Sequence, residues 1–135
     1  MATMNLKRIF VVEDNIENRV ITQMALGLLG ARIEFDRFGR DTLSKLHNFG
    51  KVDLIILDLM FPNGVTGYDI FDMIRSDTAL AAVPIVAVSA SDATTSIPLC
   101  QAKGFNGFIP KPIDIDRFPK QLEEIMNGHS VWQER

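Results

Sequence analysis

Short apolar runs alternate with longer amphipathic segments along the whole of this chain of 135 residues. The short runs are rich in β-branched residues, as buried strands are, and the longer segments repeat their apolar residues at helical spacing. Strict alternation of strand and helix is typical of a parallel sheet with helices on both faces, so we expect a doubly wound α/β fold. The predicted strands are residues 8–13, 31–36, 52–58, 83–90 and 107–112, and the predicted helices are residues 15–30, 40–50, 66–77, 97–104 and 114–126.

Three of these segments allow finer predictions. The strand 31–36 is half polar, which favours a place at the edge of the sheet. Pro98 and Pro119 fall within helical segments, and proline is tolerated mainly in a first turn, so we expect one helix to start beside Pro98 and the last to start near Asp116. In the first helical segment, Ile16, Val20, Ile21, Met24 and Leu28 repeat at helical spacing, and Gly30 is its expected C-terminal stop.

The composition indicates a soluble cytoplasmic domain. A net charge of −3 and a pI of about 5.3 argue against a general nucleic-acid-binding surface, which would be basic. No apolar run reaches the ~18–20 residues that cross a membrane, and the N-terminus lacks the apolar core of a signal peptide. The single cysteine, Cys100, excludes an intrachain disulfide.

Charged and hydroxyl side chains stand at the ends of the predicted strands. The first strand ends in Glu13 and Asp14, the third in Asp58, the fourth in Ser89, and the fifth runs into Lys111. The carboxyl ends of strands in an open parallel sheet form the edge where ligands bind. Three carboxylates repel one another there unless a cation lies between them, and Mg²⁺ takes carboxylates, water and phosphate oxygens as ligands. The sequence therefore predicts a Mg²⁺ site at this edge.

A phosphoryl group is the anion that suits this set of side chains. Lys111 supplies a point charge, Ser89 a small hydroxyl donor, and Asp58 a carboxylate nucleophile that can form an aspartyl phosphate. Each residue also has an ordinary reading as a helix cap, a turn residue or a solvated charge. Their predicted convergence on one edge favours the chemical interpretation.

The sequence resembles the receiver domains of two-component response regulators, the family with the CheY fold. The resemblance covers about residues 7–127 and rests on "VVEDN", "LIILDLMFP", "VSAS" and "GFNGFIPKP". It implies a flavodoxin-like (βα)5 sandwich whose five-stranded parallel sheet has the order 2-1-3-4-5. We expect a receiver domain over residues 1–127 and a short tail over 128–135, with no output domain.

The resemblance also implies the roles of the site residues. Asp58 would accept a phosphoryl group from a sensor histidine kinase or a phosphotransfer protein, and Ser89 and Lys111 would contact its oxygens. Mg²⁺ would bind Asp14, Asp58 and the main-chain carbonyl of Met60, with Glu13 reaching it through water.

Two further expectations concern the switch. The Lys111–Pro112 peptide would be cis. Phe108 stands at the place of the family's aromatic switch residue, although a partly exposed strand aromatic is the ordinary alternative. The chain would then be a signalling switch rather than an enzyme, limited to self-catalysed phosphoryl acceptance and autodephosphorylation. A downstream protein would bind the surface of helix 4, strand 5 and helix 5, and the chain would be a monomer or a phosphorylation-dependent dimer.

The sequence departs from the family pattern near the predicted site. The acid pair is Glu-Asp rather than Asp-Asp, and the loop after Asp58 reads as one residue longer around 63–66, before Gly67. Met60 lies beside the route of an attacking water and cannot orient it, which predicts an intermediate or slow autodephosphorylation.

Three alternatives remain open. A haloacid-dehalogenase-like phosphatase would need an acid where Met60 stands, and a flavodoxin-like cofactor binder would need a Ser-, Thr- or Gly-rich loop in place of "EDNIEN". A pseudo-receiver would have the fold and act as an interaction module without phosphorylation.

Overall fold

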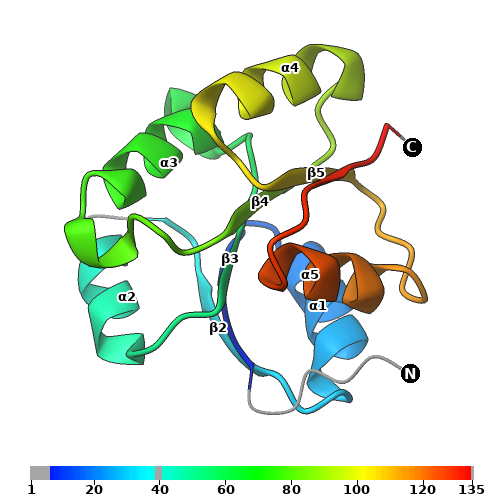
Figure 1. Cartoon of the computed structure of the whole chain (residues 1–135), viewed down its shortest axis with the longest axis horizontal. Coiled ribbons are helices and arrows are strands. Elements are labelled where there is room, and N and C mark those ends of the chain that lie inside the picture. The colour runs from blue at the N-terminus through cyan, green and yellow to red at the C-terminus, as the bar shows by residue number, and fades with distance from the viewer. Residues whose placement is uncertain (1–6, 39–40, 135) are drawn as a thin grey trace.

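The computed structural model describes residues 7–38 and 41–134. In this part of the chain, six parallel strands form one sheet in the order β2-β1-β3-β4-β5-β6. Helices cover both faces of the sheet (Figure 1). The strands are β1 (Arg8–Val12), β2 (Arg32–Asp36), β3 (Leu54–Leu57), β4 (Ile85–Ser89), β5 (Gly107–Pro110) and β6 (Val131–Trp132). The helices are α1 (Ile16–Gly27), α2 (Thr42–Phe49), α3 (Gly67–Arg75), α4 (Ala93–Lys103) and α5 (Phe118–Met126), with 3₁₀ turns η1 (Pro62–Gly64) and η2 (Thr78–Leu80).

Two apolar layers enclose the sheet. Alternate strand residues face opposite sides, so Ile9 and Val11 of β1 pack with α1 and α5, whereas Phe10 and Val12 pack with α2, α3 and α4. The central strands are apolar on both faces because both faces are covered. This arrangement leaves the carboxyl ends of β1, β3, β4 and β5 at one edge, where the polar side chains gather.

The expected order 2-1-3-4-5 is confirmed, with half-polar β2 at the edge, and a sixth strand corrects the predicted number. The N–H groups of Val131 and Gln133 donate to the carbonyls of Asn106 and Phe108 over 3.2 and 2.9 Å. Gly107 permits this approach, since a Cβ there would lie 2.6 Å from the Val131 carbonyl oxygen. Two residues are too few for a periodic pattern, so the sequence did not indicate this strand.

The starts of two helices differ from the prediction. Helix α4 begins at Ala93, so Pro98 lies inside it rather than in its first turn. Pro98 and Thr94 are both exposed, so the carbonyl that the proline leaves unpaired lies on the side of the helix that water reaches. Helix α5 begins at Phe118 rather than near Asp116, which puts Pro119 in its first turn.

The residues that helix α1 buries are not the ones that repeat at helical spacing in the sequence. The buried residues of this helix are Thr22, Ala25 and Leu26. Ile16, Val20, Met24 and Leu28 are exposed instead, so α1 is apolar on two sides. In the part of the chain that the structure describes, no helix is long and apolar enough to cross a membrane.

Candidate functional site

Asp58 lies directly after β3 at the carboxyl edge of the sheet, and it is 8% exposed. One oxygen, Oδ1, accepts the main-chain N–H groups of Leu59 and Met60 over 2.7 and 3.3 Å. The apolar strand fixes the position of the carboxylate, and the two amides hold one of its oxygens. These hydrogen bonds offset part of the cost of burying the carboxylate.

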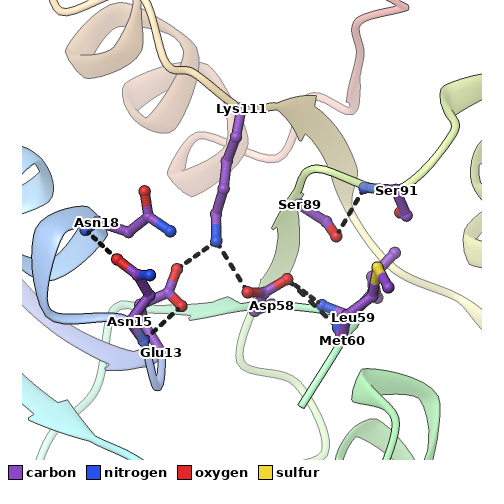
Figure 2. Close-up of polar contacts among 9 residues, drawn as sticks. All are labelled: Glu13, Asn15, Asn18, Asp58, Leu59, Met60, Ser89, Ser91 and Lys111. Atoms are coloured by element: carbon purple, nitrogen blue, oxygen red, sulfur yellow. Dashed lines mark hydrogen bonds and ion pairs between the residues drawn. The ribbon is translucent and has the colours of Figure 1, made fainter. Parts of the chain in front are cut away.

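Lys111 joins Asp58 to Glu13 across the site. Its Nζ lies 2.8 Å from Asp58 Oδ2 and 2.5 Å from Glu13 Oε1, and all three side chains are largely buried. Figure 2 shows the lysine reaching down from the end of β5 between the two acids. The ammonium thus acts as the shared counter-ion of carboxylates from β1 and β3.

The surroundings of Glu13 shift the pKa of its carboxyl group. Burial raises the pKa of Glu13, and the nearby Asp58 raises it further, while the hydrogen bond and charge of Lys111 lower it. Its other oxygen accepts the N–H of Asn15 over 3.2 Å. The net direction is upward, so the Glu13 carboxyl releases its proton at higher pH than a free glutamate.

Ser89 ends β4 and is fully buried. Its hydroxyl accepts the N–H of Ser91 over 3.2 Å, and its carbonyl accepts the N–H of Lys111 over 3.0 Å. Ser91 in turn shares a 2.8 Å hydroxyl contact with Ser96 of α4. In Figure 2 the Ser89 hydroxyl points toward the side of the site where Asp58 and Met60 lie. Through its main-chain N–H and its hydroxyl, Ser91 thus connects Ser89 with the first turn of α4.

The loop after Asp58 is closed by main-chain contacts. It contains η1, and an isolated antiparallel bridge pairs Met60 with Thr66. Thr66 caps α3 in a capping box with Asp69. Gly67 donates its N–H to Leu59 over 2.9 Å, and a Cβ at Gly67 would collide with the main-chain oxygen of Asp58.

The structure places the remaining predicted residues as follows. The Lys111–Pro112 peptide is cis. Phe108 is fully buried in the layer beneath α2, α3 and α4, so the alternative of a partly exposed aromatic is wrong. Met60 is 63% exposed at the mouth of the site. Asp14 is half-buried beside Glu13, and its side chain takes no part in the network of described residues around Lys111.

The donor chemistry suits Mg²⁺, although the donors are not gathered around one point. Carboxylate oxygens are what Mg²⁺ prefers, and Glu13, Asp14 and Asp58 all lie at this edge. Within residues 7–38 and 41–134, however, no three Asp, Glu, His or Cys side chains are close enough together to hold an ion. The Lys111 ammonium occupies the space between two of the acids, so a cation would have to displace it.

Comparison with known proteins decides the family. The family model of the response regulator receiver domain matches residues 9–123. The chain belongs to this family. Its site residues therefore lie in a receiver domain of the kind found in two-component signalling proteins, and the expected CheY-like fold is confirmed.

Individual relatives of this receiver domain are distant. It is 26% identical to the two-component response regulator ARR17 of Arabidopsis thaliana, over 90% of this chain and 86% of ARR17. It is 27% identical to the response regulator ARR3 of the same plant, over 79% of this chain but only half of ARR3. The crystal structure of the phosphorylated cyanobacterial phytochrome response regulator RcpA superposes with a TM-score of 0.75 and 28% identity, over 90% of this chain and 94% of RcpA.

Two features of the site were not predicted from the sequence. The amides of Leu59 and Met60 act through the main chain, which any residue type supplies. The lysine bridge required knowing that Lys111 points toward the sheet rather than into water. The contact of Lys111 with two acids could have been anticipated from their shared edge, because a buried cation needs a carboxylate partner.

Proposed function

We propose that Asp58 is the phosphorylation site of this receiver domain and takes its phosphoryl group from a phosphohistidine of a sensor histidine kinase or phosphotransfer protein. The observation that carries the proposal is the environment of Asp58. Its carboxylate is buried at a strand end, with two main-chain amides on one oxygen and an ammonium on the other. These contacts fix the orientation of the carboxylate, as a carboxylate nucleophile requires.

The proposed step exchanges one bond to phosphorus for another. A carboxylate oxygen of Asp58 forms a P–O bond as the P–N bond of phosphohistidine breaks, and the imidazole nitrogen keeps the electron pair and takes up a proton. Lys111 is 2.8 Å from the Asp58 oxygen and would neutralise negative charge on the phosphoryl oxygens. Ser89 can donate its hydroxyl hydrogen to a phosphoryl oxygen, since its contact with Ser91 uses the oxygen only as an acceptor.

Glu13, Asp14, Asp58 and the Met60 carbonyl are the groups that would hold Mg²⁺. The ion would supply positive charge that offsets the repulsion between the acids and the incoming phosphoryl group. Glu13 and Asp58 are both engaged by Lys111 in this structure. Binding of the ion therefore requires Lys111 to move away from at least one of them.

The proposed signal travels through Ser89. A new acceptor on Asp58 would draw the Ser89 hydroxyl, and the contact from Ser91 to Ser96 would transmit the change to α4. Phe108 is already buried, so the change there would be a repacking of its ring rather than the burial of an exposed one. The α4-β5-α5 surface would change for a downstream protein, and β6 forms part of that surface.

Acetyl phosphate provides the test. The protein is incubated with it in the presence of Mg²⁺ or of EDTA, and intact mass is measured for the wild type, Asp58→Asn and Asp41→Asn. We expect the wild type and Asp41→Asn to gain one phosphoryl group with Mg²⁺ and none with EDTA. Asp41 is a suitable control because its carboxylate is 64% exposed and lies outside the site.

The same experiment distinguishes a pseudo-receiver. The absence of three gathered metal-binding side chains among the described residues favours that second candidate. A wild type that stays unmodified with acetyl phosphate and also fails to bind beryllofluoride in Mg²⁺ would establish it. Labelling of Asp58→Asn to the wild-type level would show that the phosphorylation site is elsewhere.

Met60 sets the expected lifetime of the phosphorylated form. Its side chain is exposed beside Asp58 and has no group that positions a water for attack. We expect Met60→Asn to shorten the half-life of the phosphorylated protein several-fold, as followed by intact mass after removal of acetyl phosphate. An unchanged half-life would contradict this role.

A further inference from the structure

Tyr68 follows the residue at which α3 comes closest to Asp58. Gly67 donates its N–H to the carbonyl of Leu59 over 2.9 Å, and a Cβ at Gly67 would collide with the main-chain oxygen of Asp58. The backbone of Tyr68 is therefore held against the loop that carries the proposed phosphorylation site. Tyr68 is also the single tyrosine of the chain, which makes its side chain easy to observe.

The side chain of Tyr68 packs between α3 and α4. It is half-buried against the apolar layer on this face of the sheet, and its ring meets that of Phe105 edge-on with the centroids 6.1 Å apart. Its hydroxyl shares side-chain hydrogen bonds with Ser96 and Cys100, which are both buried residues of α4. Ser96 and Cys100 are four residues apart and so lie on the same side of that helix. Tyr68 thus connects the start of α3 with the buried side of α4.

The hydrogen bonds around Tyr68 have a definite direction. Burial raises the pKa of Tyr68, the hydrogen bond with Ser96 lowers it, and the hydrogen bond with Cys100 raises it. A donor to the phenol oxygen lowers its pKa, whereas donation by the phenol raises it, so Ser96 donates to Tyr68 and Tyr68 donates to the sulfur of Cys100. Ser96 has one hydroxyl hydrogen, so Ser91 is the donor in the 2.8 Å contact between the two serines. We name the series Ser91, Ser96 and Tyr68 the hydroxyl relay.

Two routes from Asp58 meet at Tyr68. One is the main-chain contact at Gly67. The other passes through Ser89, whose hydroxyl accepts the N–H of Ser91 over 3.2 Å and so connects the site with the hydroxyl relay. Figure 2 shows both serines on one side of Asp58. A change at Asp58 therefore reaches both the backbone and the hydroxyl of the tyrosine.

We propose that Tyr68 transmits the phosphorylation of Asp58 to the interface between α3 and α4 by losing the hydrogen bond from Ser96. The inference rests on the proposed function, because it requires a phosphoryl group on Asp58 that draws the Ser89 hydroxyl. The N–H of Ser91 then loses its acceptor, and the main chain of Ser91 shifts. Its hydroxyl no longer holds Ser96 in place, so Ser96 turns away from Tyr68.

The change is local to one end of the interface between α3 and α4. One turn beyond Tyr68 along α3, Asp72 accepts Lys103 Nζ on both oxygens over 2.9 Å. The rings of Phe71 and Phe105 stack with their centroids 4.3 Å apart. These contacts do not involve the hydroxyl relay, so the two helices stay packed while Tyr68 changes its partner. Tyr68 is thus a positioning residue of the switch and takes no part in the chemistry at Asp58.

NMR of the full chain with tyrosine carbon-13 labelled at Cζ tests the hydroxyl relay. The spectrum has one labelled signal, and Cζ carries the hydroxyl whose bonding is in question. In the free protein, Ser96→Ala should raise the pKa of Tyr68 in an alkaline titration, because the variant removes the donor that lowers it. Thr95→Ala is the matched control, since the Thr95 hydroxyl on the exposed side of α4 donates to Asp92. A Tyr68 pKa that is the same in Ser96→Ala as in the wild type overturns the relay.

Beryllofluoride with Mg²⁺ at pH 7 tests the response to Asp58. We expect the Tyr68 signal of the wild type to move in the direction in which Ser96→Ala moves it, and the signal of Asp58→Asn to stay in place. Ser96→Ala should reduce the response at least twofold, whereas Thr95→Ala should keep its full size. Far-UV circular dichroism checks that each variant is folded.

Intact mass after treatment with acetyl phosphate and Mg²⁺ separates the two proposals. A wild type that is phosphorylated while its Tyr68 signal stays in place overturns the relay and leaves the proposed phosphorylation intact. A full response in Ser96→Ala also overturns the relay, because the change then reaches Tyr68 by another route. A wild type that is not phosphorylated and does not respond to beryllofluoride overturns both proposals.

Discussion

Replacement of Lys111 by methionine removes the charge that two buried acids share. Methionine keeps an unbranched apolar chain, so the variant loses the ammonium while much of the packing of the chain remains. Asp58 retains the two amides on its other oxygen, whereas Glu13 retains only the N–H of Asn15. The loss therefore falls mainly on Glu13, whose side chain is 7% exposed.

The size of the effect follows from burial. Removing one partner of a buried ion pair destabilises a protein by about 3–5 kcal/mol, because the other charge stays buried without compensation. Since Asp58 keeps its amide donors, we expect the lower end, about 3 kcal/mol in the free energy of unfolding at pH 7.

The effect depends on pH with a definite sign. Burial already raises the pKa of Glu13, and Lys111 is the group that lowers it, so the variant raises this pKa further. The folded variant then keeps a proton on Glu13 that the unfolded chain releases above its ordinary pKa of 4.5. Stability falls by up to about 1.4 kcal/mol per pH unit between that value and the raised pKa. Lowering the pH from about 7 toward 5 should therefore recover part of the lost stability.

Urea denaturation followed by far-UV circular dichroism measures these changes, with an unchanged m-value as the sign that two-state unfolding persists. Lys51→Met is the control, because the Lys51 side chain is 80% exposed and should cost little. A Lys111→Met variant as stable as the wild type at pH 7 would refute the role of the shared charge. Equal destabilisation at both pH values would show that the loss comes from packing.

Three further predictions concern close contacts and one thiol. Gly67→Ala should lower the free energy of unfolding, measured in urea, by about 1–3 kcal/mol, because the added Cβ would collide with the main chain of Asp58. A variant as stable as the wild type would show that the loop can shift. Gly107→Ala should push β6 away from β5 and speed hydrogen exchange of the Gln133 amide about tenfold. An unchanged exchange rate would mean that β6 accommodates the added Cβ and keeps its pairing with β5. Burial raises the pKa of Cys100 to about 11, so about one thiol in a thousand is ionised at pH 8. A thiol reagent should therefore label the folded protein far more slowly than the urea-unfolded one, and equal rates would contradict the burial of Cys100.

Much of the architecture follows from the sequence because the central strands have only one plausible environment. A run such as Leu54–Leu57 is apolar on both faces, and in strict alternation with helices it belongs in a covered parallel sheet. The same reasoning places Asp58, Ser89 and Lys111 at the ends of neighbouring strands. The structure brings Asp58 and Lys111 into direct contact and adds Glu13 to them.

The errors have physical causes that a single sequence does not expose. Helical spacing cannot distinguish an inner from an outer face when both are apolar, so the spacing of the apolar residues of α1 does not show that most of them are exposed. Pro98 was placed in a first turn because proline breaks a helical hydrogen bond, yet an exposed helix side lets water replace that bond. The lysine bridge depends on where one flexible side chain points, which tertiary packing decides.

The position of Trp132 has a practical consequence. It is the single tryptophan of the chain, it is half-buried against the core, and its register partner in β5 is Phe108, three residues before Lys111. Indole emission depends on the polarity around the ring, so a rearrangement of this part of the sheet should appear as a spectral shift without any attached dye. Trp132 is thus an intrinsic fluorescent reporter on β6, beside the strand β5 whose end leads into Lys111.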